Sequence, residues 1–428
     1  MGKTRWAIGT LNLIAWTLAS CSSLGGLNAE KSAITWRPKQ TIAKGRKDYS
    51  PPAVYMDDSG RVDVAWIEKE KENERASVRF LHLTGSEQTE QQSAVVNPPD
   101  SAPNATHISP GLAAGPSGEI YLSWSVPKHT PNNDFAADLV LVRSVNGGRS
   151  FESPVVVNDD RGTASRGFEG LTTAPDGTVY LGWLDGRDKD KSRAGAFFAQ
   201  STDQGRTVGK NLKMDGMACP CCRVTMATAP DGDVFAGWRK VFDHDIRDIV
   251  LARSEDKGQT FSPSRVVRKD GWSFPACPHR GPSVAFDKLG RLYVTWYTEG
   301  SDEQPRVLFA TSDDKGKTFS KAISLHTASG SLPDQPRMVV RPDGTVLVVW
   351  EEVTGVRMRV VLRTSLDRGA TFSPAQALSE GAKSFNPAIS INEAGQFAIA
   401  WNASAFPNSL IELMTGAVQE SKSKKAQP

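Results

Sequence analysis

Four cysteines and one histidine form the part of the sequence with the clearest capacity for chemistry. Three of the cysteines are nearly contiguous, and the fourth precedes the histidine by two positions. The five residues are Cys219, Cys221, Cys222, Cys277 and His279. Thiolate and imidazole groups together suit copper, as Cu(I), or zinc. Four cysteines in an oxidising compartment are also expected to form disulfides, and a redox-active thiol is the third interpretation. All three interpretations stay open at this point.

Five arginines in or near the same segments form a second candidate site. They are Arg187, Arg223, Arg239, Arg247 and Arg280. A guanidinium group binds a carboxylate through two parallel hydrogen bonds, so a convergent set of arginines would hold an anionic ligand, either a glycan or another anion. The alternative for each arginine is a structural ion pair with a neighbouring carboxylate.

The strands that position these residues belong to a repeat, and each copy of the repeat contains a motif that ends in tryptophan. A turn with glycine, an alternating apolar run and a tryptophan recur seven times, at intervals of 58, 59, 55, 58, 54 and 51 residues between tryptophans. Alternation is the periodicity of a β-strand, and glycine suits a tight hairpin because it accepts positive φ. The repeated tryptophans are Trp66, Trp124, Trp183, Trp238, Trp296, Trp350 and Trp401.

A second motif lies between successive tryptophans and occurs five times. The copies begin at Ser144, Ser201, Ser254, Ser312 and Ser365. They resemble the Asp box, S-x-D-x-G-x-T-F, of the sialidase-like BNR repeat families. We expect the carboxylate to accept backbone N–H bonds, the glycine to take positive φ and the aromatic residue to pack between units. These roles are structural, so the motif predicts a fold and no chemistry.

Together the motifs predict an all-β protein, a seven-bladed β-propeller over 34–418 with four antiparallel strands per blade. The six-bladed propeller of enzymatic sialidases is the alternative. The last repeat ends after a third strand, at Val418, and the segment 34–42 resembles the missing fourth. We therefore expect the N-terminal strand to close the ring, which would remove open sheet edges. The loops after each tryptophan and the crossings between blades share one face, called the top face here, and both candidate sites fall on it.

A narrower resemblance covers the stretch from Cys219 to Trp296. The matching pieces are Cys219-Pro-Cys-Cys-Arg223, Trp238-Arg239, Ile246-Arg-Asp-Ile249, Asp270-Gly-Trp272 and Cys277-Pro-His279. They are similar to a group of bacterial proteins often labelled exo-α-sialidase. The resemblance implies an exo-acting glycoside hydrolase as an alternative to simple ligand binding. A non-catalytic envelope scaffold or a copper- or zinc-handling protein is a third hypothesis.

The hydrolase hypothesis needs a tyrosine nucleophile with a carboxylate partner and a separate acid. The candidates are Tyr297 as nucleophile, Glu299 or Glu351 as its partner, and Asp185 or Asp245 as the acid. The F/Y-R-I-P motif that carries the first arginine of sialidases is absent from the sequence. Whether the protein is an enzyme is therefore left open.

The N-terminus has the features of an export signal. Lys3 and Arg5 precede a short apolar stretch, and Leu18-Ala-Ser-Cys21 resembles the bacterial lipoprotein box. We expect a signal peptide over 1–20, lipidation of Cys21, a tether over 21–33 and a disordered tail over 419–428. A plain signal peptide cut near Ala29 is the alternative. The predicted location is the cell envelope, on the periplasmic side of the outer membrane.

The charge balance limits the choice of partners. The chain has 51 Lys and Arg against 48 Asp and Glu, a net charge of +3. So small an excess creates no long-range field for nucleic acid, and we expect contact with a membrane only through the lipid anchor. The expected partner is an anionic small molecule, a glycan or an envelope protein, and the expected state is a monomer.

Overall fold

The computed structural model describes residues 34–71, 75–84, 93–103, 107–188, 193–379 and 383–419. The predicted signal peptide, the tether with Cys21 and the tail beyond residue 419 lie outside these ranges. The described residues are almost entirely strand and loop, with two short 3-10 helices, η1 (Pro99–Ser101) and η3 (Asp243–Asp245). No helix in the described part is long and apolar enough to cross a membrane. The prediction of an all-β protein is confirmed.

The first part of the chain forms three of the five hydrogen-bonded sheets, with five, four and eight strands. Their strands are β3 (Lys47–Tyr49), β4 (Ala53–Met56), β5 (Val62–Glu70), β6 (Ala76–Leu83) and β7 (Ala94–Val95); β8 (Gly111–Ala114), β9 (Ile120–Pro127), β10 (Ala137–Ser144) and β11 (Val155–Val156); and β12 (Arg166–Thr173), β13 (Val179–Asp185), β14 (Ala194–Ser201), β15 (Leu212–Ala218), β16 (Thr225–Thr228), β17 (Val234–Val241), β18 (Arg247–Ser254) and β19 (Arg265–Val266).

The remaining two sheets have four and nine strands, and the larger one contains both ends of the described chain. The strands are β20 (Ser283–Phe286), β21 (Leu292–Thr298), β22 (Arg306–Ser312) and β23 (Ile323–Ser324); and β24 (Leu332–Val340), β25 (Val346–Thr354), β26 (Arg357–Ser365), β27 (Gln376–Ala377), β28 (Lys383–Ile391), β29 (Gln396–Ala405) and β30 (Asn408–Val418), with β1 (Ile34–Trp36) and β2 (Gln40–Gly45).

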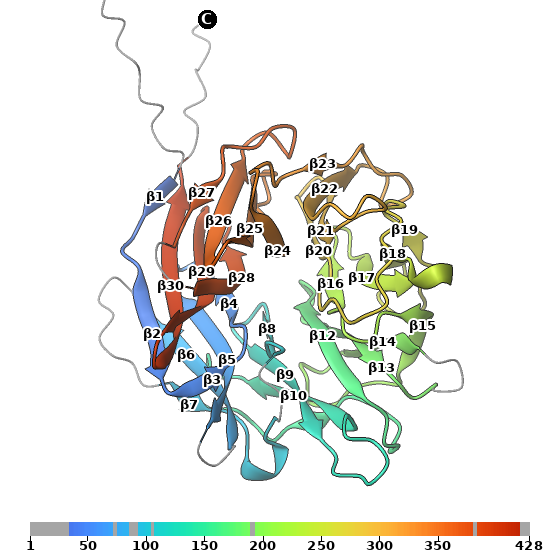
Figure 1. The fold of residues 1–428 in the computed structure, drawn as a ribbon. Helices are drawn as coiled ribbons and strands as arrows, with labels where there is room; N and C mark the ends of the chain where they lie inside the picture. The colour runs from blue at the N-terminus through green and yellow to red at the C-terminus, as the bar shows by residue number, and fades with distance from the viewer. Residues whose placement is uncertain are drawn as a thin grey trace, which may run out of the picture.

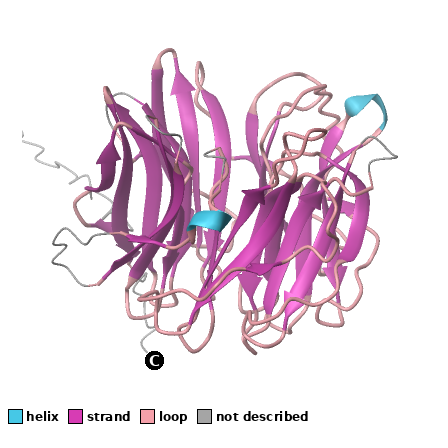
Figure 2. Ribbon diagram, turned by 90° about the horizontal axis from the view of Figure 1, so that it is seen from below, coloured by secondary structure: helices cyan, strands magenta, loops and turns pink. Residues whose placement is uncertain are grey.

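The sheets are arranged around a common centre, as Figure 1 shows, and their strands run between two edges that carry the loops (Figure 2). β1 and β2 both pair antiparallel with β30, with Ile34 opposite Val418. This is the pairing that the N-terminal segment was expected to make. The fold is of the propeller type, while seven blades and a closed ring stay predictions.

The repeated tryptophans lie within the strands β5, β9, β13, β17, β21, β25 and β29 and pack in the cores between repeats. Five of the seven side chains are 0% exposed and the other two are 1% exposed. Each packs in a separate apolar cluster built from two neighbouring repeats; Trp183, for example, packs with Tyr121 and Leu139 of the preceding repeat. Burial of a large aromatic side chain stabilises a fold by a few kcal/mol. The regular spacing of tryptophan therefore reflects one anchor per repeat.

The Asp boxes make the local bonds that were predicted. In the copy at Ser254, Asp256 Oδ1 accepts the Thr260 N–H at 2.9 Å and Oδ2 accepts the Thr260 hydroxyl at 2.6 Å. Gly258 has φ +89°, and the Phe261 ring packs edge-on against Phe198 at 4.9 Å. The five boxes hold the turns between strands and join neighbouring repeats.

The boxes and the glycine turns share one edge of the sheets. Lys257 of one box donates to Asp176, in the glycine turn of the preceding repeat, at 3.0 Å. Arg368 of another box donates to Asp287 at 2.6 Å in the same way. These ties assign the boxes to the edge opposite the cysteine-bearing loops.

Candidate functional site

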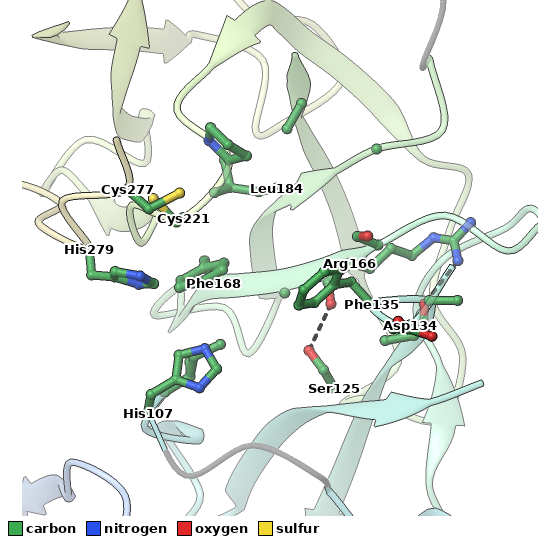
Figure 3. Close-up of a pocket in the computed structure, with 18 of the residues that line it drawn as sticks. His107, Ser125, Asp134, Phe135, Arg166, Phe168, Leu184, Cys221, Cys277 and His279 are labelled. Carbon is green, nitrogen blue, oxygen red and sulfur yellow. Dashed lines mark hydrogen bonds between the residues drawn. The ribbon is translucent and has the colours of Figure 1, made fainter. Parts of the chain in front are cut away.

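A cavity of about 660 Å³ opens on the top face where loops of several repeats meet. Its wall includes His107, Phe168, Cys221, Cys277 and His279 (Figure 3). Phe168 belongs to β12, and the other four come from three different crossings between repeats. The exposed ring of Phe135 and the side chains of Ile108 and Leu184 add an apolar side to the cavity. The cavity thus combines aromatic, imidazole and thiol groups.

Two histidines and a phenylalanine face one another across the mouth of this cavity (Figure 3). The ring centroids of His107 and His279 are 5.7 Å apart, and those of Phe168 and His279 are also 5.7 Å apart. Phe168 and His279 both have φ 57°, a conformation rare for residues with a side chain. At Phe168 this backbone belongs to a bulge in the pairing of β12 with β13. Burial lowers the pKa of both histidines, which favours neutral imidazoles.

The three neighbouring cysteines bring their sulfur atoms together. The Cys222 N–H donates to the Cys219 carbonyl oxygen at 3.3 Å, which bends the chain into a turn. The Sγ of Cys219 lies 3.2 Å from that of Cys222 and 3.8 Å from that of Cys221. An extended chain would direct Cys221 and Cys222 to opposite sides, so this turn is what makes the group possible. All three residues are buried, and they are free thiols in this structure.

Cys277 and His279 stand apart from this three-sulfur group. Cys277 is exposed and lies on the cavity wall with Cys221 and His279. The group of ligand atoms that could share one metal ion contains only the other three cysteines, among the described residues. The predicted set of five is therefore divided between a buried thiol group and the wall of the cavity.

A smaller cavity of about 60 Å³ shares His107, Phe168 and His279 with the first and contains two arginines. Arg223 donates to the Ser109 carbonyl oxygen, and Arg337 Nη1 donates to the Pro336 carbonyl oxygen at 3.1 Å. Within the described part of the chain, no carboxylate oxygen lies within 4.0 Å of either guanidinium group.

Two buried carboxylates lie near these arginines. Glu351 accepts the Asn386 N–H at 2.6 Å, and burial, together with the charge of Asp334, raises the pKa of Glu351 to about 7. Glu169 accepts a hydrogen bond from Ser123 at 3.3 Å through one oxygen only. Burial also raises the pKa of Glu169. A carboxyl group that titrates near neutrality can act as a general acid.

The arginines predicted to bind a ligand have different surroundings. Arg187 donates to Asp185 at 2.8 Å and to Asp159 at 2.7 Å, and Arg280 forms a two-bond pair with Asp334 at 2.5 and 2.6 Å. These contacts match the structural ion pair that was the alternative.

Two more of the five predicted arginines, Arg239 and Arg247, are buried among protein atoms. Arg239 donates to the carbonyl oxygens of Arg280, Arg247 and Tyr297, and its guanidinium stacks on Trp272. Arg247 donates to Cys219 Sγ. Of the five predicted arginines, Arg223 is the one that lines the smaller cavity.

Arg337 was not among the predicted site residues. The signal in the sequence was its position near the start of a repeat, which it shares with Arg166, Arg223 and Arg280. His107 and Phe168 carried no comparable signal, because their role depends on which crossings meet at the centre.

The predicted nucleophile and its partner do pair. Tyr297 donates its hydroxyl to Glu299 Oε1 at 2.6 Å, and Arg280 lies over the tyrosine ring at 4.3 Å. However, Tyr297 is only 3% exposed, and burial followed by the Glu299 contact raises its pKa. Neither residue lines the two cavities described above.

The predicted acids are also held by protein groups. Asp185 is fully buried and accepts hydrogen bonds from Trp183 and Arg187. Asp245 accepts from Arg193 at 2.6 Å. The catalytic roles of all four residues stay predictions.

Comparisons with known proteins show the type of fold. A model of the BNR repeat-like domain matches residues 247–404. A Dyadobacter fermentans protein of unknown function is 15% identical with a TM-score of 0.54, over 91% of this chain and 100% of its own. The polysaccharide lyase PL25, an ulvan lyase bound to -[GlcA(1-4)Rha3S]-, is 11% identical with a TM-score of 0.54, over 90% and 98%. The Hadza microbial sialidase Hz136 is 14% identical with a TM-score of 0.50, over 83% and 76%.

At these identities the likenesses concern the fold alone. No curated protein matches the sequence. Residues 247–404 therefore resemble a BNR repeat-like domain, and the chain has a sialidase-like fold of the propeller type.

Proposed function

We propose that the protein is a carbohydrate-active, seven-bladed β-propeller that binds an acidic sugar at the centre of its top face. The observation that carries this proposal is the pair Arg223 and Arg337, which line one cavity and have no carboxylate within ion-pair distance in the described structure. A guanidinium pair of this kind binds a carboxylate or sulfate strongly, because such hydrogen bonds are charge-assisted.

The electrostatics of the two arginines favour an anion between them. Burial, and next the like charge of Arg223, lower the pKa of Arg337 to about 10. Glu169 and Glu351 are the nearby carboxyl groups, and the raised pKa of each weakens its power to neutralise the arginines. An acidic ligand would supply the missing negative charge.

The adjoining cavity suits the rest of a sugar chain. The aromatic faces of Phe168 and Phe135 provide apolar surface for pyranose rings, and neutral His107 and His279 can donate or accept hydrogen bonds from hydroxyls. The ulvan lyase, which shares the fold, holds a glucuronate-containing saccharide. We extend to this chain the class of acidic sugars, not the lyase reaction.

A second candidate function is cleavage of such a sugar. It is favoured by Glu351, whose pKa of about 7 and place near the arginines fit a general acid. The hydrogen-bonded pair of Tyr297 and Glu299 fits the exo-sialidase type of hydrolysis only if the tyrosine becomes accessible to substrate.

We expect the variant Arg337→Gln to lose affinity for acidic sugars. Calorimetric titration of the wild-type protein with a glucuronate-containing oligosaccharide, with 3′-sialyllactose and with neutral lactose should detect binding of an acidic sugar only. Loss of one charge-assisted contact should weaken that binding by ~2 kcal/mol, or roughly 30-fold. The exposed Arg149→Gln is the matched control and should bind as the wild type does. Equal affinity in Arg337→Gln and wild type would refute the assignment.

We also propose that the protein is a lipoprotein of the cell envelope, anchored through Cys21. The lipoprotein box Leu18-Ala-Ser-Cys21 supports this proposal. Intact-mass measurement of the protein extracted from membranes should show acyl chains on a chain that begins at Cys21. A mature N-terminus near Ala29 with no lipid would contradict it.

A further inference from the structure

Three buried thiols form a group that the sugar-binding proposal does not use. The Sγ atoms of Cys219, Cys221 and Cys222 all lie within 4.8 Å of one another, with measured separations of 3.2 and 3.8 Å from Cys219. Sulfur ligands of one three-coordinate ion with bonds of ~2.3 Å would be ~4.0 Å apart. The Cys219–Cys221 separation of 3.8 Å is close to this value, and the Cys219–Cys222 pair, at 3.2 Å, would move apart by less than 1 Å to share an ion.

A charge next to the group favours a thiolate at Cys219. Arg247 is 3% exposed, and its Nη1 donates to Cys219 Sγ at 2.9 Å. The nearest carboxylate oxygen, on Asp245, is 3.7 Å from Arg247 Nη2. Asp245 is thus an ion-pair partner of Arg247. A buried cation is costly unless anions compensate it, and a thiolate at Cys219, which is closer to the guanidinium than Asp245, would add to that compensation. A guanidinium in this position also stabilises the negative charge of a metal held by several thiolates.

We propose that Cys219, Cys221 and Cys222 bind one Cu(I) ion in a three-coordinate site. Soft thiolate ligands select Cu(I), whereas a structural zinc site is completed by a fourth protein ligand. Among the described residues, no fourth histidine, cysteine or carboxylate ligand belongs to this group. Three thiolates and one monovalent ion carry a net charge of −2, which Arg247 offsets in part. Binding displaces the thiol protons to solvent and changes no oxidation state.

The cavity gives the ion a route to the site. Cys221 lies on the cavity wall, while Cys219 and Cys222 are 0% exposed behind it. Cys277 and His279 line the same cavity (Figure 3), and both are exposed to solvent. An arriving Cu(I) ion would meet these two side chains first and then reach Cys221.

Titration of the anaerobically reduced full chain with Cu(I), buffered by bathocuproine disulfonate, tests the proposal. The wild type should take up one tightly held Cu(I) per chain, and so should Cys277→Ser, which leaves the three-thiol group intact. The variants Cys219→Ser and Cys222→Ser should lose that copper. Arg247→Gln keeps the thiols and should bind about 10-fold more weakly, as changes next to metal ligands commonly do.

X-ray absorption of the copper-loaded wild type provides a readout that does not depend on the folding of any variant. Three sulfur neighbours and no nitrogen or oxygen would support the site. A coordination shell that contains nitrogen, loss of copper in Cys277→Ser, or tight uptake of Zn(II) with no uptake of Cu(I) would overturn the proposal. A disulfide between two of the three cysteines in the protein as isolated from cells would overturn it as well.

Discussion

Arg223 and Arg337 differ from the neighbouring arginines in what they contact. Arg187 and Arg280 are bound by aspartates, and Arg239 by three carbonyl oxygens, so their hydrogen-bonding capacity is largely used inside the protein. The two cavity arginines make only backbone contacts among the hydrogen bonds described. At the scale of single residues, this difference separates a structural arginine from one that can bind a ligand.

Glu351 gives a prediction at the same scale. Its pKa rises from the ordinary value of 4.5 to about 7 in the folded protein, so folding favours the neutral form. The resulting cost to stability is absent below about pH 4, grows as the pH rises and is complete above about pH 7. Glu351→Gln removes the titration and should raise the unfolding free energy relative to wild type by up to ~3 kcal/mol at pH 8, and by little at pH 4.

Urea unfolding at the two pH values would measure this difference. The exposed Glu303→Gln controls for the loss of one negative charge and should show no comparable gain. A Glu351→Gln variant that is destabilised by the same amount at both pH values would contradict the account.

At the scale of the elements, the turns are where the sequence specifies conformation most strictly. Gly258 in an Asp box and Gly232 in a hairpin turn have nearly equal φ angles, +89° and +91°. A Cβ at Gly258 would come within 2.6 Å of the Phe198 ring, whereas nothing lies within 4 Å of the corresponding position at Gly232. An alanine at Gly232 would therefore add only backbone strain, whereas an alanine at Gly258 would also disturb the packing between repeats.

The change of each glycine to alanine should therefore have different effects. Gly232→Ala should cost ~1 kcal/mol, for the left-handed backbone alone. Gly258→Ala should cost ~1–3 kcal/mol more, because it also displaces an aromatic contact between repeats. Thermal unfolding of both variants beside wild type would check this, and equal losses would show that the box does not join the repeats as described.

The elements were also the part of the structure that the sequence predicted best. Strand periodicity, the tryptophan at the end of each run and the Asp-box bonds are local features, set by residues within about ten positions of one another. The bulge at Phe168 and the turn from Cys219 to Cys222 are also local features, but no residue type in these segments predicted them. They change the direction of side chains at the site. As a result, the three neighbouring cysteines form a group apart from Cys277 and His279, although all five were predicted to act together.

At the scale of the whole molecule, the site is assembled from segments far apart in the chain. His107, Phe168, Arg223, His279 and Arg337 span more than half of the sequence and meet only because the sheets surround one centre (Figure 1). The sequence predicted that the crossings meet on one face. It did not predict which arginines find partners, since Arg280 is paired with Asp334, 54 positions away.

We propose that the smaller cavity holds the acidic group of a sugar between Arg223 and Arg337. The most direct test is a crystal structure of the protein with a glucuronate-containing oligosaccharide. We expect density for the sugar carboxylate within hydrogen-bond distance of both guanidinium groups, with the sugar ring against Phe168. A saccharide bound elsewhere on the molecule, with the two arginines free of it, would contradict the claim.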